Sequence, residues 1–466
     1  MFHTNHRISK PLGLLVGLLA CITVQAQQSL SLKDALKLTV ENYGIIHAKQ
    51  HYAEAAESGV RTAELEYLPN LTISAQQDYG TVNGQNGPLY GFGGYAVSSS
   101  GLPLANQSWN SGFGALYLAN INWEVFTFGR IRERIKTAQN ISIREHNDYQ
   151  QEIFQQQVKV AAAYLNLLAA RSLTKSWQKN LSRADAFSTL VKTRARNQLI
   201  PGVDSSQANA EVSNARIALT KAMDNEQEQQ NRLAQLMGVP PQDFILDSLF
   251  LKQVPRVAVD TSTKRLHPVL AWYQSRVNVS ESQARYLDRF KYPSVSLVGI
   301  FQMRGSGFYS NYSQDQNSYT SNYFDGITPN RANYLLGIGL TWNVSQLLKV
   351  PPQVNSQQLT TLGLQKEFEQ TQKVLSAQLQ LSETKLKNAF ANYREVPFQL
   401  KAASDAYNQR SVLFKNGLTN LVDVTQALYA LVRAETERDI AYNNVWQALL
   451  LKAAAIGDLE IFTSEF

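Results

Sequence analysis

Apolar and polar residues alternate with a period of two in four short stretches of the chain, at about 70–80, 112–127, 293–304 and 333–346. This is the period of a β-strand with one apolar and one polar face. Strands of roughly 10 residues can cross an outer membrane at a tilt. A sheet in lipid cannot leave its edges unpaired, and four strands are too few to close a barrel, so we expect the chain to pool strands with copies of itself. A soluble four-stranded sheet is the alternative, because alternation does not distinguish lipid from a protein core.

Long helical stretches follow the second and the fourth of these strands. The pattern predicts helices at about 130–197, 203–237, 353–416 and 421–456. The first contains no proline or glycine, so at 1.5 Å per residue it would reach about 100 Å. The last carries alanine at a strict seven-residue spacing, at Ala427, Ala434, Ala441, Ala448 and Ala455. A small residue at one heptad position lets neighbouring helices approach closely, so we expect coiled-coil packing.

The chain also contains an internal repeat. Residues 123–238 align without a gap on residues 342–457, at a constant offset of 219. The alignment places Trp123 on Trp342, and Asp204 on Asp423. We therefore expect a mixed α+β fold made of a duplicated unit, with repeats at 27–262 and 263–466, each holding two strands and long helices.

The first 26 residues have the build of a secretory signal peptide, with basic residues, an apolar run and a small-residue cleavage site. Lipidation at Cys21, the only cysteine, is a competing interpretation. Cleavage after Ala26 would leave no cysteine, which excludes disulfides and zinc–thiolate sites. It would also lower the net charge from +7 to +5. That charge is mild and dispersed, so we expect no nucleic-acid partner. No later apolar run approaches the length of a transmembrane helix.

The turns between the long helices carry a family resemblance. They read Asn197-Gln198-Leu199-Ile200-Pro201-Gly202-Val203-Asp204 and Asn416-Gly417-Leu418-Thr419-Asn420-Leu421-Val422-Asp423. With the duplicated order of strands and helices, these turns resemble the TolC family of outer-membrane efflux proteins over about residues 30–457. The resemblance implies a homotrimer in the outer membrane, with a 12-stranded β-barrel continuous with a periplasmic α-barrel. It also implies that the turns form the closed end, where a periplasmic adaptor and, through it, an inner-membrane pump would dock.

The same resemblance assigns roles to residues of the turns. Asp423 falls where the family has an acidic constriction ring, which would attract cations; the alternative is an ordinary acid in the first turn of a helix. The family's second acid is replaced by Gln426, its basic lock by Thr419 and its aromatic partner by Phe414, which lacks a hydroxyl. Asp204 is expected to cap its helix or to join hydrogen bonds at the turn. The adaptor contacts would be Leu199, Ile200, Pro201, Gly202, Gly417, Leu418 and Leu421.

The sequence offers little for catalysis or for a cofactor. His47, His51 and Glu54 share one predicted helix face, but no fourth ligand is in register, so a solvated face is favoured over a metal site. No nucleophile elbow or phosphate-binding glycine loop appears. We therefore predict a non-enzymatic exit duct of a tripartite efflux system, gated at its periplasmic turns and driven by the pump. The alternatives are a structural coiled-coil protein without a pore, an ungated outer-membrane pore, and an outer-membrane enzyme.

Overall fold

The computed structural model describes residues 29–84, 101–247, 249–255 and 266–465. The expected signal peptide, with Cys21, lies outside the described residues. The elements are α1 (Leu32–Asn42), α2 (Gly44–Leu65), β1 (Asn70–Thr81), β2 (Ser111–Phe126), α3 (Arg130–Arg196), α4 (Gly202–Met237), α5 (Leu249–Lys252), α6 (Pro268–Asp288), η1 (Arg289–Lys291), β3 (Ser294–Ser306), α7 (Tyr323–Ile327), β4 (Arg331–Thr341), α8 (Gln346–Lys415), α9 (Leu421–Ile456) and α10 (Glu460–Thr463). They fall into two compact units, whose boundaries lie at the end of α1, between α5 and α6, and within α3, α8 and α9. The sheet unit holds residues 42–159, 255–392 and those after 446, and the tip unit holds residues up to 41, 160–254 and 393–446.

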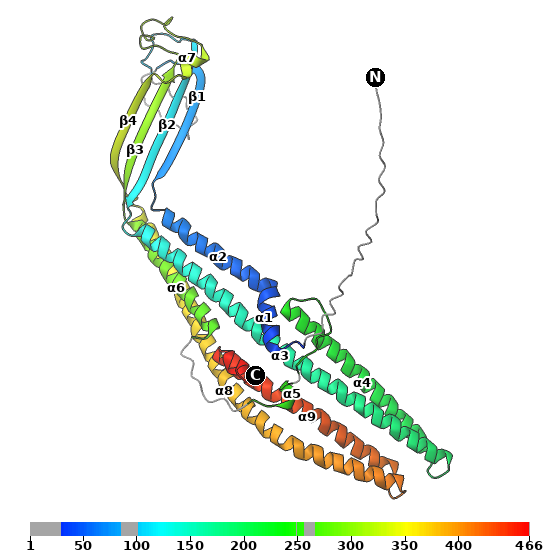
Figure 1. The fold of residues 1–466 in the computed structure, drawn as a ribbon. Coiled ribbons are helices and arrows are strands. Elements are labelled where there is room, and N and C mark those ends of the chain that lie inside the picture. Colours follow the sequence, from blue (N-terminus) through cyan, green and yellow to red (C-terminus); the bar gives the residue numbers. More distant parts are fainter. Residues whose placement is uncertain (1–28, 85–100, 248, 256–265, 466) are drawn as a thin grey trace, which may run out of the picture. The chain divides into compact units, whose positions relative to one another are not determined.

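The sheet unit contains one four-stranded antiparallel sheet in the order β1-β2-β3-β4 (Figure 1). The pairing register sets apolar side chains in rows across the strands: Leu71, Ile121, Gly299 and Leu336 form one row, and Ile73, Ala119, Phe301 and Tyr334 form the next. Ile73 and Leu336 are each 79% exposed, so this apolar face is largely uncovered within one chain. Among the described residues, β1 pairs only with β2 and β4 only with β3, which leaves two strand edges open.

The internal repeat is visible in the hydrogen bonds at the base of the sheet. The indole Nε1 of Trp123 donates to the carbonyl of Tyr67 at 2.7 Å, and that of Trp342 donates to the carbonyl of Lys291 at 3.1 Å. Each acceptor lies two residues before a proline that precedes a strand. The two tryptophans therefore hold the segments that lead into β1 and β3 at equivalent positions of the two repeats.

The limits of the long helices also follow the offset of 219 residues. Helices α4 and α9 begin at Gly202 and Leu421, and their preceding helices α3 and α8 end at Arg196 and Lys415. The predicted alanine positions are largely buried, with Ala434, Ala441, Ala448 and Ala455 each at most 8% exposed. The seven-residue spacing thus marks the packed side of α9.

Two element boundaries differ from the predicted ones. The start of α8 near 353 was wrong, because the helix begins at Gln346 and continues through Pro351 and Pro352. The carbonyls that these prolines leave unpaired belong to exposed residues of the first turns, so they are not buried without a partner. The strand expected to 346 ends at Thr341. Its ladder stops there because the partner strand begins at Ser294, directly after a proline that has no N–H to donate.

In the tip unit, a group of aromatic residues packs against the segment that follows α4. The Tyr164 hydroxyl donates to the carbonyl of Leu30 at 2.8 Å and accepts from the backbone N–H of Asp247 at 3.1 Å. Phe250 lies between Tyr164 and Trp446, with ring centroids 5.9 Å and 4.9 Å away. Burial raises the pKa of Tyr164 above its ordinary value, so the phenol stays a neutral hydrogen-bonding group.

In the sheet unit, His267 caps the first turn of α6. Its Nδ1 accepts from the backbone N–H of Val269 at 3.1 Å, and its Nε2 lies 3.0 Å from the carbonyl of Ala454. Burial lowers the pKa of His267, and the bond to Ala454 opposes that shift only in part. Gly457 closes over the ring with a φ of +86°, where an added Cβ would lie 2.6 Å from the ring carbon Cδ2. The imidazole is therefore a neutral cap, and position 457 beside it has no room for a residue larger than glycine.

Candidate functional site at the helical tips

Two chain turns form the tips, one between α3 and α4 and one between α8 and α9. Each turn contains a residue in the left-handed region: Gln198 with φ +57° and Gly417 with φ +74°. The next residue then donates back to the end of the helix, Leu199 to the carbonyl of Arg194 and Leu418 to that of Leu413, both at 2.9 Å. These are equivalent positions in the two repeats, so the turns share one backbone design, with Gly417 meeting its demand without strain.

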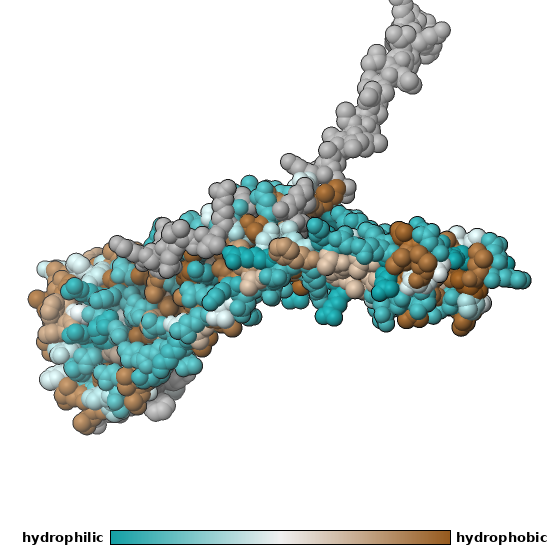
Figure 2. Space-filling view, turned by 90° about the horizontal axis from the view of Figure 1, so that it is seen from below, coloured by the Kyte–Doolittle hydropathy of each residue, from teal (hydrophilic) through white to brown (hydrophobic). Residues whose placement is uncertain are grey.

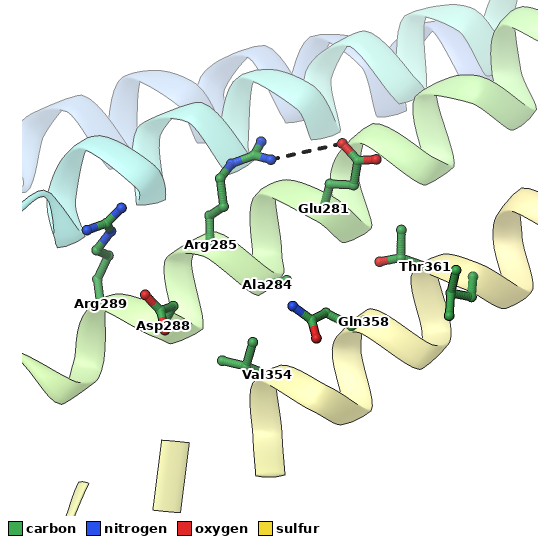
Figure 3. A pocket seen from close by; sticks show the side chains of 9 residues that line it. Glu281, Ala284, Arg285, Asp288, Arg289, Val354, Gln358 and Thr361 are labelled. Carbon is green, nitrogen blue, oxygen red and sulfur yellow. Dashed lines mark ion pairs between the residues drawn. The ribbon is translucent and has the colours of Figure 1, made fainter. Parts of the chain in front are cut away.

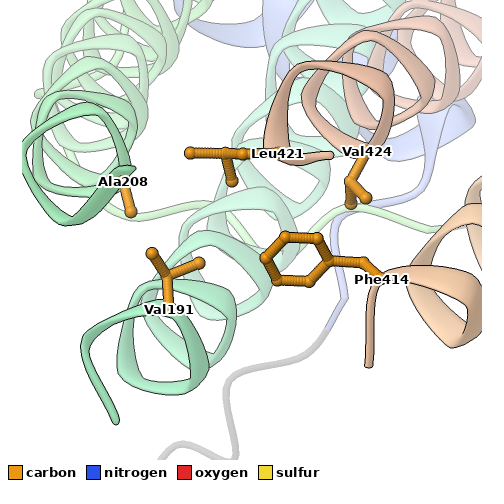
Figure 4. Packing of buried hydrophobic residues seen from close by; sticks show 5 residues of the cluster. All are labelled: Val191, Ala208, Phe414, Leu421 and Val424. Atoms are coloured by element: carbon orange, nitrogen blue, oxygen red, sulfur yellow. The ribbon is translucent and has the colours of Figure 1, made fainter. Parts of the chain in front are cut away.

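A buried apolar cluster joins the two tips. It consists of Val191, Ala208, Phe414, Leu421 and Val424, which come from four helices and point toward a common centre (Figure 4). Phe187, Leu190, Ile200 and Tyr407 pack around it. Phe414 is only 2% exposed, and its ring centroid lies 5.3 Å from that of Phe187. Because both helical pairs contribute, moving one tip away from the other would expose this cluster.

Arg194 adds a polar clamp that sequence reasoning missed. Its Nη1 donates to the carbonyls of Phe414 and Lys415, at 2.5 Å and 2.9 Å, and its guanidinium carbon lies 5.3 Å from the centre of the Phe414 ring. The last carbonyls of a helix have no partner within the helix, and a cation is favourable at that end. Arg194 therefore caps α8 from α3. The sequence carries no signal for this pair, because the partners are main-chain atoms of a distant segment.

Asp423 lies in the first turn of α9, where its backbone N–H donates to the Asn420 side chain at 2.9 Å. Its Oδ2 accepts from the Thr419 hydroxyl at 2.5 Å and from the Arg410 guanidinium at 3.2 Å. The structure thus brings Thr419 and Asp423 together and adds Arg410, which sequence reasoning did not single out. Gln426 is exposed on the same helix. Phe414 contributes a main-chain acceptor to the tip, and its side chain belongs to the apolar cluster.

Asp204 occupies the equivalent place in the first repeat but differs in its surroundings. Within the described part of the chain, its carboxylate makes no hydrogen bond or ion pair. The residue before α4 is Pro201, which offers no side-chain cap. The expected tip hydrogen bonds of Asp204 are therefore absent from the described residues, and its remaining role there is that of an acid near a helix N-terminus.

The residues expected to contact an adaptor divide into two groups. Leu199 and Leu418 are 64% and 71% exposed, and Pro201, Gly202 and Gly417 are also exposed. Leu421, at 3% exposed, lies inside the apolar cluster and offers no surface, and Ile200 packs against the same cluster. Buried and exposed residues alternate in this region because α4 and α9 begin here, and one side of each helix faces the cluster. In Figure 2, brown hydrophobic groups are interspersed among the teal hydrophilic groups that make up most of this face.

Features outside the tips carry less chemistry. A groove of about 560 Å³ between α6 and α8 is lined by acidic and basic side chains of α6, with Arg285 4.0 Å from Glu281 and 3.4 Å from Glu133 (Figure 3). No group of three or more potential metal ligands occurs among the described residues. His51 pairs with Glu54 at 3.1 Å on an exposed face. None of the helices described here is both long and apolar enough to cross a membrane.

Comparison with known proteins agrees with this fold. Residues 36–239, most of the first repeat, match the family model described as outer membrane efflux protein. No curated protein matches the sequence. Among solved structures, the CmeC outer membrane channel of Campylobacter jejuni matches with a TM-score of 0.74 at 13% identity, covering 91% of this chain and 85% of CmeC.

Two further channels match over similar lengths. The outer membrane protein VceC of Vibrio cholerae gives a TM-score of 0.71 at 14% identity, covering 92% of this chain and 96% of VceC. The open state of the MtrE outer membrane channel of Neisseria gonorrhoeae gives 0.70 at 15% identity, covering 92% and 89%. The first repeat thus matches the family model of outer membrane efflux proteins, and these solved channels share the fold of the chain over both repeats.

Proposed function

We propose that this protein is the outer-membrane exit duct of a tripartite export system. Three copies form the duct, the tips close its periplasmic end, and an inner-membrane pump that docks through a periplasmic adaptor supplies the energy. The helices that follow the strands extend into the periplasm.

The sheet carries this proposal. Its apolar rows run across all four strands and are largely exposed in one chain, and both of its outer strands have an open edge. Open edges in lipid leave several unpaired N–H and C=O groups, each of which costs several kcal/mol. Pairing the β4 edge of one copy with the β1 edge of the next satisfies both. Three copies then close a 12-stranded β-barrel, whose apolar face meets lipid and whose polar face lines the lumen.

Cross-linking tests this closure. Each variant carries two cysteines in one chain, one at Ser74 in β1 and the other at Asn333, Leu335 or Gly337 in β4. Each protein is then oxidised in membranes. One of the pairs should give a ladder of cross-linked chains that ends at three. The control places cysteines at Leu118 and Gln302, which pair within one chain and should leave only monomers. Monomers from every edge pair would contradict the proposal.

The tips are the proposed gate and docking point. Leu199 and Leu418 are among the apolar side chains that the two turns expose, while the cluster beneath them holds the helical pairs together. An adaptor that binds these leucines buries apolar surface. The binding free energy can then favour a state in which the helical pairs α3–α4 and α8–α9 are separated.

The docking role is tested by changing Leu199 and Leu418 to Asp together. Adaptor binding and export should both fall, while the trimer should remain intact because neither residue is buried. Ile217→Asp is the matched control, since Ile217 is 55% exposed on α4 away from the turns. Unchanged binding and export in the double variant would remove these leucines from the interface.

A further inference from the structure

The Asp423 carboxylate is held by its own chain. Arg410, near the end of α8, reaches across the hairpin to Oδ2 at 3.2 Å, and the Thr419 hydroxyl donates to the same oxygen at 2.5 Å. The next residue, Val424, is 1% exposed in the tip cluster and fixes the rotation of α9. The acid therefore has a defined orientation beside a full positive charge. Both side chains remain partly exposed, Arg410 at 49% and Asp423 at 36%, so ions can approach the pair.

The duplication supplies an internal comparison for this arrangement. At the constant offset, Arg410 corresponds to Val191 and Thr419 corresponds to Ile200. Both counterparts are apolar members of the tip cluster or its surroundings, and Asp204 is accordingly left without a partner in the described structure. The acid is present in both repeats, whereas its positive partner is present in only one. Arg410 is thus not a by-product of the shared hairpin design.

We propose that Arg410 determines the ion selectivity of the duct by cancelling the charge of Asp423. This inference rests on the proposed function, in which the tips close the duct, and on the family resemblance that implies a constriction at Asp423. Three unpaired carboxylates at a narrow mouth would give a local charge of −3 and a strong cation preference. With Arg410 beside each one, the mouth carries three neutral pairs. The duct then admits anionic and cationic cargo with little discrimination, and selection is left to the pump.

The proposal is tested as a charge cycle in planar bilayers. The permeability ratio of K⁺ to Cl⁻ is measured at low salt, because exposed charges are screened within about 10 Å at 0.1 M ionic strength. Arg410→Gln should raise the ratio on the order of tenfold, the lower end of the enrichment produced by clefts lined with one sign of charge. Asp423→Asn should move it below the wild-type value, toward anions. The double variant should return close to wild type.

Two further variants distinguish charge from structure. Arg410→Lys keeps the positive charge while losing the planar guanidinium, and should therefore keep the wild-type ratio. Arg216→Gln removes another exposed arginine of the tip unit, which lies 4.0 Å from Asp185, and should leave the ratio unchanged. Channels whose ratio is the same in wild type and Arg410→Gln would overturn this inference and leave the duct standing. Well-folded trimers without any conductance would overturn the proposed function itself.

Discussion

Replacing Phe414 by Ala should release the tips from each other. The ring is 2% exposed, packs 5.3 Å from Phe187 and lies under the Arg194 guanidinium. Removing a buried Phe side chain costs about 3–5 kcal/mol, since transfer energy is lost and a cavity remains. The cost falls on local opening of the tips, because the cluster is confined to their helices.

Hydrogen exchange of the backbone amides near residues 410–425 measures that opening. Each 1.4 kcal/mol changes an equilibrium tenfold, so exchange at the tips should accelerate by about 10²–10⁴. Phe398→Ala is the control, because Phe398 belongs to the same helix but is 73% exposed; a change of at most about 0.5 kcal/mol is expected. Tip amides that exchange as slowly in Phe414→Ala as in wild type would refute the view that this cluster holds the tips closed.

Three further predictions concern stability in detergent, read as the thermal unfolding midpoint. Because burial lowers the pKa of His267, the folded state binds fewer protons there than the unfolded state, so stability should fall as the pH drops below about 6.5, and this dependence should shrink in His267→Gln. Gly299→Ala should destabilise by about 1–3 kcal/mol, since its Cβ would lie 2.7 Å from the stiff Ile121 side chain; Gly337→Ala, with open space around it, should not, and equal midpoints would exclude the clash. Trp342→Phe should cost about 0.5–1.5 kcal/mol through loss of its indole hydrogen bond, and an unchanged midpoint would count against that bond.

The repeated fold was accessible from the sequence because its causes are local and periodic. The alternation in each strand and the alanine spacing of α9 are direct consequences of which face is buried. The constant offset then extends each observation to the other repeat, which is why α4 and α9 have equivalent limits. The start of α8 was misjudged because Pro351 and Pro352 look like breakers, although an exposed early helical turn tolerates them.

The contacts at the tips could not be predicted in the same way. Arg194 binds main-chain carbonyls of another hairpin, and Arg410 reaches Asp423 across a turn; neither partnership follows from a period or a motif. Leu421 was expected on the surface because it belongs to the turn, but it is the first residue of α9 and faces inward. Such outcomes depend on how four helix ends meet in space.

Single-channel recording tests the central claim of a duct closed at its tips most directly. The purified protein is inserted in planar bilayers as wild type and with Arg194→Ala and Phe414→Ala combined. A closed tip predicts small wild-type conductance that grows several-fold in the variant, because the clamp and the cluster are both removed. A large wild-type conductance that the variant leaves unchanged would contradict the gate. No conductance from well-folded protein would contradict the duct.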